Sequence, residues 1–176
     1  MRLNLREIIE IPGGSVPFSQ ELDTALLDFP SVRAYTAPIT AEGKVVNTAG
    51  ILTLQGRLHA EMLCVCDRCG AEFPRTVDLD LHADITADAQ DDDPEVFTLD
   101  GDWLDVDEVL STCFILSMDT KCLCKPDCAG LCDRCGANLN LGPCRCQKPR
   151  DPRMAVLEQL LDNKTDEEEE AAHNSD

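Results

Sequence analysis

The sequence has few aromatic side chains and no long apolar run. Phenylalanine, tryptophan and tyrosine make up 4% of its 176 residues, so a surface that stacks nucleic-acid bases is not expected. No stretch of about 18 apolar residues occurs, which argues against a membrane-spanning helix. The first residues, Met1 to Glu7, do not form an apolar leader, so no signal peptide is expected. These absences predict a cytoplasmic protein without a membrane partner.

Signatures of catalysis are also missing. The sequence contains no phosphate-binding P-loop, no GxGxxG and no GxSxG. The three histidines, His59, His82 and His173, are isolated and pair with no persuasive nucleophile. We therefore expect a protein that is not an enzyme and has no small-molecule substrate.

Positive charge is scarce, since 15 basic residues stand against 34 acidic ones and give a formal net charge of −19. Such a chain repels nucleic acid on average and favours basic partners. Residues 78–108 hold no lysine or arginine, whereas residues 121–153 are weakly basic. The candidates in that segment for contact with RNA phosphate are Arg134, Arg145, Lys148 and Arg150.

Two stretches alternate apolar and polar residues with the period of a half-buried strand. The first begins at Ile51 and continues to Cys64, and the second covers residues 76–88. The residues between them include Cys66-Asp67-Arg68-Cys69-Gly70, which is typical of a turn. The pattern predicts a large antiparallel hairpin with a CxxC motif at its tip.

The hairpin indicates an α+β fold with an antiparallel twisted sheet or partly open β-barrel. A flanking helix is expected near residues 105–117, with Asp105 as N-cap and Glu108 three residues later. A C-terminal helix should begin at Asp151 and end near Asn163. We predict a β-rich domain over 1–120, with an acidic loop over 88–102, then a cysteine-rich segment plus helix over 121–163. Residues 164–176 form an acidic tail with too few apolar groups to fold.

The chain has 11 cysteines, an odd count that argues for thiols or metal ligands rather than disulfides. Four thiolates bind one tetrahedral Zn²⁺, and a CxxC turn followed by glycine supplies two of them. Cys132 and Cys135 have this form, and the second pair is either Cys144 with Cys146 or Cys124 with Cys128. The sequence thus predicts one zinc site from four of six residues: Cys124, Cys128, Cys132, Cys135, Cys144 and Cys146. Iron also suits four thiolates.

The hexapeptide CDRCGA occurs twice, at residues 66–71 and 132–137. Cys66 and Cys69 therefore either share a site with the C-terminal segment, or form part of a second site, or use the same turn without metal. Cys64 and Cys113 follow the apolar periodicity and are expected in the core, and Cys122 is not expected to ligate.

The C-terminal motif resembles the YceD family of bacterial large-subunit ribosomal RNA accumulation proteins. The resemblance depends on the cysteine pattern from Cys124 to Cys146, on Asn138-Leu139-Asn140, and on Asp151-Pro152-Arg153. Ile11-Pro12-Gly13-Gly14 and Cys66-x-Arg68-Cys69 also fit. The chain departs from the family at residues 117–122, where a Leu-Pro-Met type of stretch is usual.

The resemblance implies a small non-enzymatic protein of ribosome assembly that supports accumulation of large-subunit (23S) ribosomal RNA. Its expected partners are the pre-ribosomal large subunit, a basic ribosomal protein or ribosomal RNA. Two other functions stay open: a generic zinc-stabilised protein-interaction module and a thiol redox protein.

Overall fold

A computed structural model describes residues 1–86 and 96–146 of the chain. It divides the chain into two compact units, Met1–Leu131 and Cys132–Asp176. The domain boundary expected near residue 120 stays a prediction. The helix expected from Asp151, the acidic tail, Lys148 and Arg150 lie outside the described residues, as does most of the acidic loop.

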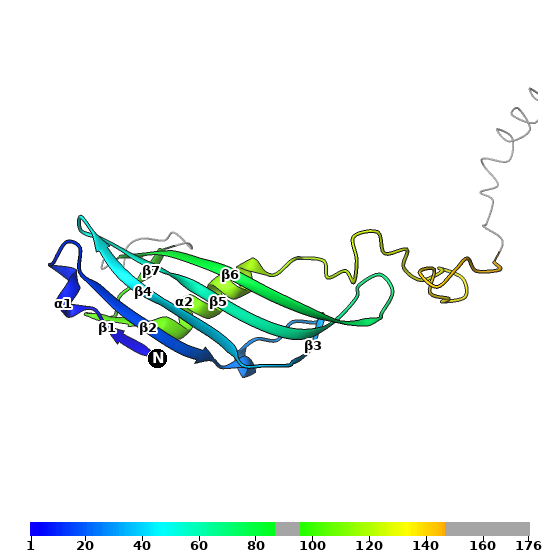
Figure 1. Cartoon of the computed structure of the whole chain (residues 1–176), viewed down its shortest axis with the longest axis horizontal. Coiled ribbons are helices and arrows are strands. Elements are labelled where there is room, and N and C mark those ends of the chain that lie inside the picture. Colours follow the sequence, from blue (N-terminus) through cyan, green and yellow to red (C-terminus); the bar gives the residue numbers. More distant parts are fainter. Residues whose placement is uncertain (87–95, 147–176) are drawn as a thin grey trace, which may run out of the picture. The chain divides into compact units, whose positions relative to one another are not determined.

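The first unit is built on a six-stranded open sheet with the strand order β2-β4-β5-β6-β7, in which β3 also pairs with β5 (Figure 1). Strands β1 and β8 form a separate two-stranded antiparallel sheet. These strands do not close into a barrel, so the open twisted sheet is the correct form of the predicted α+β fold. The elements are β1 (Arg2–Asn4), α1 (Arg6–Ile9), β2 (Ser15–Leu22), a 3₁₀ turn (Thr24–Leu26), β3 (Val32–Tyr35), β4 (Ile39–Thr48), β5 (Ile51–Val65), β6 (Glu72–Thr86), β7 (Val96–Thr98), β8 (Trp103–Asp105) and α2 (Val106–Ser117).

The predicted hairpin is confirmed as β5 and β6, which are antiparallel from the pair Leu52–Ile85 to the pair Val65–Glu72. The alternation explains its register. The even residues of β5 are buried except the half-buried Gly56, and the odd residues from Leu81 in β6 are buried, whereas Asp78 and Asp80 are exposed. A shift by one residue would exchange the two faces, so burial fixes the pairing.

Helix α2 packs on the buried face of the sheet. Val106, Val109, Leu110 and Phe114 are buried on its apolar side. The Phe114 ring meets the Phe29 ring edge to face, with centroids 5.8 Å apart. Because a single sheet buries only one face, this helix completes the hydrophobic core. No described helix is both long and apolar enough to cross a membrane.

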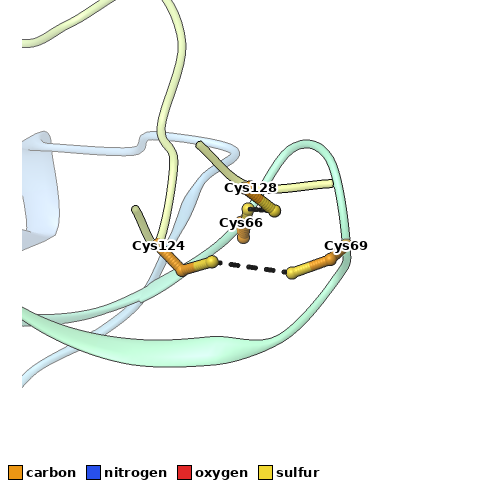
Figure 2. Close-up of side chains that lie close together, drawn as sticks. All are labelled: Cys66, Cys69, Cys124 and Cys128. Carbon is orange, nitrogen blue, oxygen red and sulfur yellow. Dashed lines mark hydrogen bonds between the residues drawn. The ribbon is translucent and has the colours of Figure 1, made fainter. Parts of the chain in front are cut away.

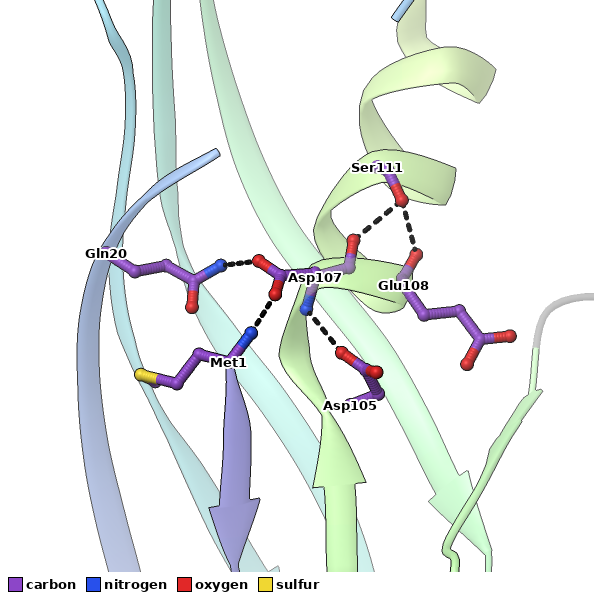
Figure 3. A network of polar contacts seen from close by, with 6 residues as sticks. All are labelled: Met1, Gln20, Asp105, Asp107, Glu108 and Ser111. Carbon is purple, nitrogen blue, oxygen red and sulfur yellow. Dashed lines mark hydrogen bonds and ion pairs between the residues drawn. The ribbon is translucent and has the colours of Figure 1, made fainter. Parts of the chain in front are cut away.

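The start of α2 is capped as predicted. The Asp105 side chain accepts a hydrogen bond from the Asp107 backbone N–H at 3.1 Å. The Asp107 carboxylate in turn accepts from the Gln20 amide at 2.5 Å and pairs with the amino group of Met1 (Figure 3). These contacts join the helix start to β2 and to Met1, the residue before β1.

Candidate metal centre

Eight of the 11 cysteines gather in two groups of four. We call Cys66, Cys69, Cys124 and Cys128 tetrad 1, and Cys132, Cys135, Cys144 and Cys146 tetrad 2. Within each tetrad all four Sγ atoms lie within 4.8 Å of one another. Tetrad 1 belongs to the sheet unit (Figure 2), and tetrad 2 lies within the second unit.

The repeated hexapeptide makes the same turn in both places. In tetrad 1 the N–H of Cys66 donates to Ala71 at 2.9 Å, and the N–H of Gly70 donates to Cys66 at 2.8 Å. In tetrad 2 the corresponding bonds measure 2.8 and 2.9 Å. Gly70 and Gly136 adopt φ angles of 67° and 69°, which glycine adopts without steric cost. The repeat is therefore one local structure that presents two thiols, used twice.

The other two thiols of tetrad 1 come from the chain after α2. Asp67 anchors this segment twice: its backbone N–H donates to the Cys122 carbonyl at 2.9 Å, and its carboxylate accepts from the Cys122 N–H at 2.6 Å. The Arg68 guanidinium donates to the Cys128 carbonyl at 3.0 Å. The Arg68 carbonyl accepts from the Leu131 N–H at 3.1 Å. These bonds hold Cys124 and Cys128 against the hairpin tip.

The sulfur spacing fits a tetrahedral metal ion. A Zn–S distance of about 2.3 Å requires sulfurs about 3.8 Å apart at the corners of a tetrahedron. The Sγ atoms of Cys66 and Cys128 are 3.8 Å apart, and those of Cys69 and Cys124 are 3.7 Å apart. In tetrad 2 the Sγ atoms of Cys132 and Cys144 are 3.4 Å apart. Each tetrad therefore has the donors and the size to hold one metal ion.

Local hydrogen bonds favour a thiolate at the first cysteine of each turn. Burial alone would raise the pKa of Cys66, but backbone N–H groups of Cys124, Cys69 and Arg68 outweigh it and lower the pKa to about 6. The pKa of Cys132 falls to about 7, chiefly because the backbone N–H groups of Cys135 and Arg134 donate to its sulfur. Such N–H···S bonds stabilise the charged form that binds metal.

Other cysteines in the tetrads resist ionisation. Burial, followed by the neighbouring thiols, raises the pKa of Cys124 to about 12. Proximity to Cys135, followed by burial, raises the pKa of Cys146 to about 12. Sulfurs this close do not all ionise without a compensating positive charge, and a coordinated cation supplies it.

The two tetrads differ in burial. In tetrad 1, Cys66, Cys69 and Cys128 are buried and Cys124 is half-buried. Phe73 and Leu123 pack against this cluster. In tetrad 2, only Cys132 is buried, and Cys135 is exposed. Tetrad 1 therefore forms a small buried cluster separate from the main core, whereas tetrad 2 is accessible to solvent.

The structure brings together all eight cysteines singled out in the sequence, but in a partition that the sequence left open. Cys132 and Cys135 lie with Cys144 and Cys146, and Cys124 and Cys128 lie with the hairpin tip. Among the described phosphate-contact candidates, Arg134 and Arg145 are exposed in the second unit.

The remaining cysteines lie outside both tetrads. Cys64 and Cys122 are buried in the main core, and Cys113 is half-buried against it. No sequence pattern indicates that Asp67 joins the two halves of tetrad 1, because its partner is a backbone group 55 residues away.

Comparison with known proteins shows that the chain matches a described protein family. Residues 54–161 match the family described as Large ribosomal RNA subunit accumulation protein YceD. Uncharacterized proteins of Mycobacterium tuberculosis and Mycobacterium bovis are 27% identical over 122 residues, covering 66% of this chain and 58% of theirs. A maize protein named Large ribosomal RNA subunit accumulation protein YCED homolog 1, chloroplastic, is 24% identical over 147 residues, covering 65% of this chain and 50% of its own length.

The chain thus spans only about half the length of the curated relatives it matches. No solved structure matches it. The family match, however, covers more than half of the chain and includes both tetrads. The chain therefore belongs to the YceD family.

Proposed function

We propose that this protein is a non-enzymatic accessory factor of ribosome assembly that supports accumulation of large-subunit ribosomal RNA and binds two zinc ions, one in each tetrad. The observation that carries the proposal is the family match over residues 54–161, because it is named for this role and includes all eight tetrad cysteines. The protein acts in the cytoplasm on the pre-ribosomal large subunit.

Zinc is the metal favoured by the donor set. Four thiolates in a closed tetrahedral site are typical of structural zinc. The buried position of three cysteines of tetrad 1 supports a role in holding the hairpin tip to the chain after α2. Zinc in such a site contributes directly to folding free energy. Elemental mass spectrometry on protein purified without added metal should find two zinc ions per chain and no iron.

The charge distribution supports contact with a particle that contains both protein and RNA. A net charge of −19 disfavours tight binding to naked RNA. Arg134 and Arg145 are exposed beside tetrad 2 and contact phosphate, together with Lys148 and Arg150. The acidic residues of the sheet unit face a basic ribosomal protein.

Depletion of the protein from its own host tests the role. We expect the ratio of large-subunit to small-subunit ribosomal RNA to fall, and the wild-type chain to restore it. A Cys66→Ser/Cys69→Ser variant should restore it poorly. Cys113→Ser is the matched control, because Cys113 is a half-buried cysteine outside both tetrads. An unchanged RNA ratio after depletion contradicts the role.

The alternative of a generic zinc-stabilised interaction module is favoured by the exposed aspartates of β6, Asp78, Asp80 and Asp84, which suit basic proteins in general. Co-sedimentation with large-subunit precursors separates the two functions, since only the ribosomal one requires it. A thiol redox function has less support, because both CxxC motifs lie in turns and not at the start of a described helix.

A further inference from the structure

Strand β6 lies at an open edge of the sheet for much of its length. Strand β5 pairs with one side of it over the whole hairpin, but on the other side β7 reaches only Asp84 to Thr86. Among the described residues, no strand pairs with that outer side before Asp84. An unpaired edge of this kind is a template for an additional strand.

The direction of the backbone groups follows from two observations. The Thr86 carbonyl accepts from the Leu99 N–H at 3.0 Å, so Thr86 faces away from β5. On β5, the Glu61 carbonyl accepts from the Thr36 N–H at 2.9 Å and therefore points to the opposite side of the hairpin. In the register, odd residues of β5 oppose even residues of β6. Both observations show that the backbone N–H and C=O groups of the even residues of β6 point away from β5.

The outward-facing residues before β7 are Thr76, Asp78, Asp80 and His82. Within the described part of the chain, nothing hydrogen-bonds their backbone groups on this side. Pro74 is also an even residue, so its missing N–H limits the free edge at that end. The open segment is thus Thr76 to His82, about 20 Å long at the usual strand rise.

A groove of about 470 Å³ with both apolar and polar lining residues lies beside this edge, and the polar ones include Asp80, His82 and Asp84. Leu79 and Leu81 line it from β6, Phe97 from β7, and Leu116 from the last turn of α2. Leu116 is 71% exposed, more than any other large apolar side chain that the structure describes in the sheet unit. Because alternate side chains of a strand point to opposite faces, an added strand would place every second side chain in this groove.

The charge around the edge selects the occupant. Asp78, Asp80 and Asp84 are exposed along β6, and residues 76–86 contain no lysine or arginine. Strand β5 supplies two partners, since Arg57 pairs with Asp80 at 3.3 Å and His59 contacts Asp78 at 2.6 Å, but the Asp78 and Asp80 side chains remain 79% and 89% exposed. A second copy of this chain would place its own acidic edge against this one, and the two would repel each other. RNA is disfavoured because its phosphates are also negatively charged. Residues 87–95 of this chain carry five acidic side chains and are disfavoured for the same reason.

We propose that the outer edge of β6 from Thr76 to His82 binds an extended basic segment of a partner protein as an added strand. The partner's backbone pairs with the outward N–H and C=O groups, its apolar side chains enter the groove against Leu116, and its lysines or arginines meet Asp78 and Asp80. The inference deepens the proposed function and rests on it only for the existence of a protein partner.

The test measures binding of a fluorescent peptide of about ten residues with alternating valine and lysine to the purified full chain. The same peptide with glutamate in place of lysine is the charge control. His82→Pro removes an outward N–H without removing a β5–β6 bond, and His82→Thr is its matched control. Leu116→Lys places a positive charge in the groove. Leu141→Lys is its control, because it changes an exposed leucine of the second unit, which is 89% exposed.

We expect the lysine peptide to bind with a micromolar dissociation constant and the glutamate peptide to bind at least about tenfold more weakly. His82→Pro and Leu116→Lys should each weaken binding by about tenfold, whereas both controls should stay within about twofold of wild type. On peptide addition, backbone amides of Asp78, Asp80 and His82 should exchange with solvent more slowly.

Equal binding by wild type and by both edge variants would overturn the proposal, as would displacement of the peptide by oligouridylate. If wild type binds no peptide but a chain with a Gly-Ser linker over residues 88–94 does, the edge belongs to the chain's own segment and the proposal fails. Circular dichroism checks that His82→Pro is folded. If it is not, the peptide affinity of Leu116→Lys alone tests the proposal. A normal ribosomal RNA phenotype with intact peptide binding contradicts only the proposed function.

Discussion

Asp67 and Cys122 bind each other through two hydrogen bonds, one from each backbone N–H. Asp67 donates to the Cys122 carbonyl at 2.9 Å, and the Asp67 carboxylate accepts from the Cys122 N–H at 2.6 Å. Cys124 follows two residues after Cys122, so this pair determines where the second half of tetrad 1 begins.

Replacement of Asp67 by alanine should weaken metal binding at tetrad 1. The variant loses the carboxylate bond to Cys122, which costs about 1–3 kcal/mol and should lower metal affinity by about 10–100-fold, as removal of an outer-shell partner does. Asp133→Ala is the matched control, because Asp133 holds the same position in the second hexapeptide. Competition with a chromogenic chelator measures both affinities. Equal losses in the two variants would contradict the anchoring role.

Metal removal should affect the two units differently. Tetrad 1 joins the hairpin tip to the chain after α2, so Cys66→Ser/Cys69→Ser should lower the melting temperature of the sheet by several degrees. Cys132→Ser/Cys135→Ser should leave the main transition within about two degrees. Differential scanning calorimetry with near-ultraviolet circular dichroism measures this.

The number of reactive thiols provides the control for that experiment. With both tetrads loaded, only Cys64, Cys113 and Cys122 remain unligated. A thiol reagent added to the denatured, chelated protein should count 11 cysteines. A count of 11 in the native protein without chelator would mean that neither tetrad holds metal.

Tyr35 should make stability depend on alkaline pH. Burial, with smaller effects from Cys64 and Asp28, raises its pKa from 10.0 to about 12, and its hydroxyl donates to the Leu27 carbonyl at 3.1 Å. The folded state thus prefers the neutral phenol, so this contribution is present below pH 10 and is lost as the pH rises towards 12. Because the chain has one tyrosine, phenolate absorbance follows Tyr35 alone.

The comparison of wild type with Tyr35→Phe isolates that contribution. The free energy of unfolding of wild type should fall more steeply above pH 10 than that of the variant. A phenolate titration with a midpoint near 10 in folded protein, judged by far-ultraviolet circular dichroism, would show that Tyr35 is not shielded.

The hairpin could be predicted because the patterns that specify it lie within consecutive residues of the sequence. The alternation of apolar and polar residues in both strands indicates which side chains face the core, and the CxxC motif followed by glycine indicates the turn between the strands. The cap at Asp105 is also local and was predicted. The short strand β7 was not predicted, because its parallel pairing is with Asp84 to Thr86, and its own three residues are too few to show a periodic pattern.

The partition of the cysteines is not a local property. Spacing within residues 124–146 allows Cys132 and Cys135 to pair with either neighbour. Which cysteines lie together depends on the path of the chain after α2. That path is determined by the packing of Phe114 in the core and by the hydrogen bonds of Asp67 and Arg68 at the hairpin tip. Contacts between segments more than 50 residues apart leave no trace in residue spacing.

Asn47 should be among the polar residues most important for stability. Its side chain is 1% exposed, and its amide donates to the carbonyls of Ile8 and Ile9 at 2.7 and 2.8 Å. Its carbonyl oxygen accepts from the Gly50 N–H at 2.8 Å. One side chain therefore forms hydrogen bonds with backbone groups at the end of α1 and in the turn between β4 and β5.

Asn47→Asp keeps the shape of the side chain but replaces its two N–H donors by an acceptor oxygen, which would face the carbonyls of Ile8 and Ile9. We expect a loss of about 3 kcal/mol or more for Asn47→Asp at neutral pH, and a smaller loss for Asn47→Ala. Asn4→Ala is the control, because Asn4 is an exposed asparagine that accepts one local bond from Arg6. Urea unfolding measures all three. The Asn47→Asp loss should shrink as the pH falls and the carboxyl regains a proton, and a loss independent of pH would contradict this account.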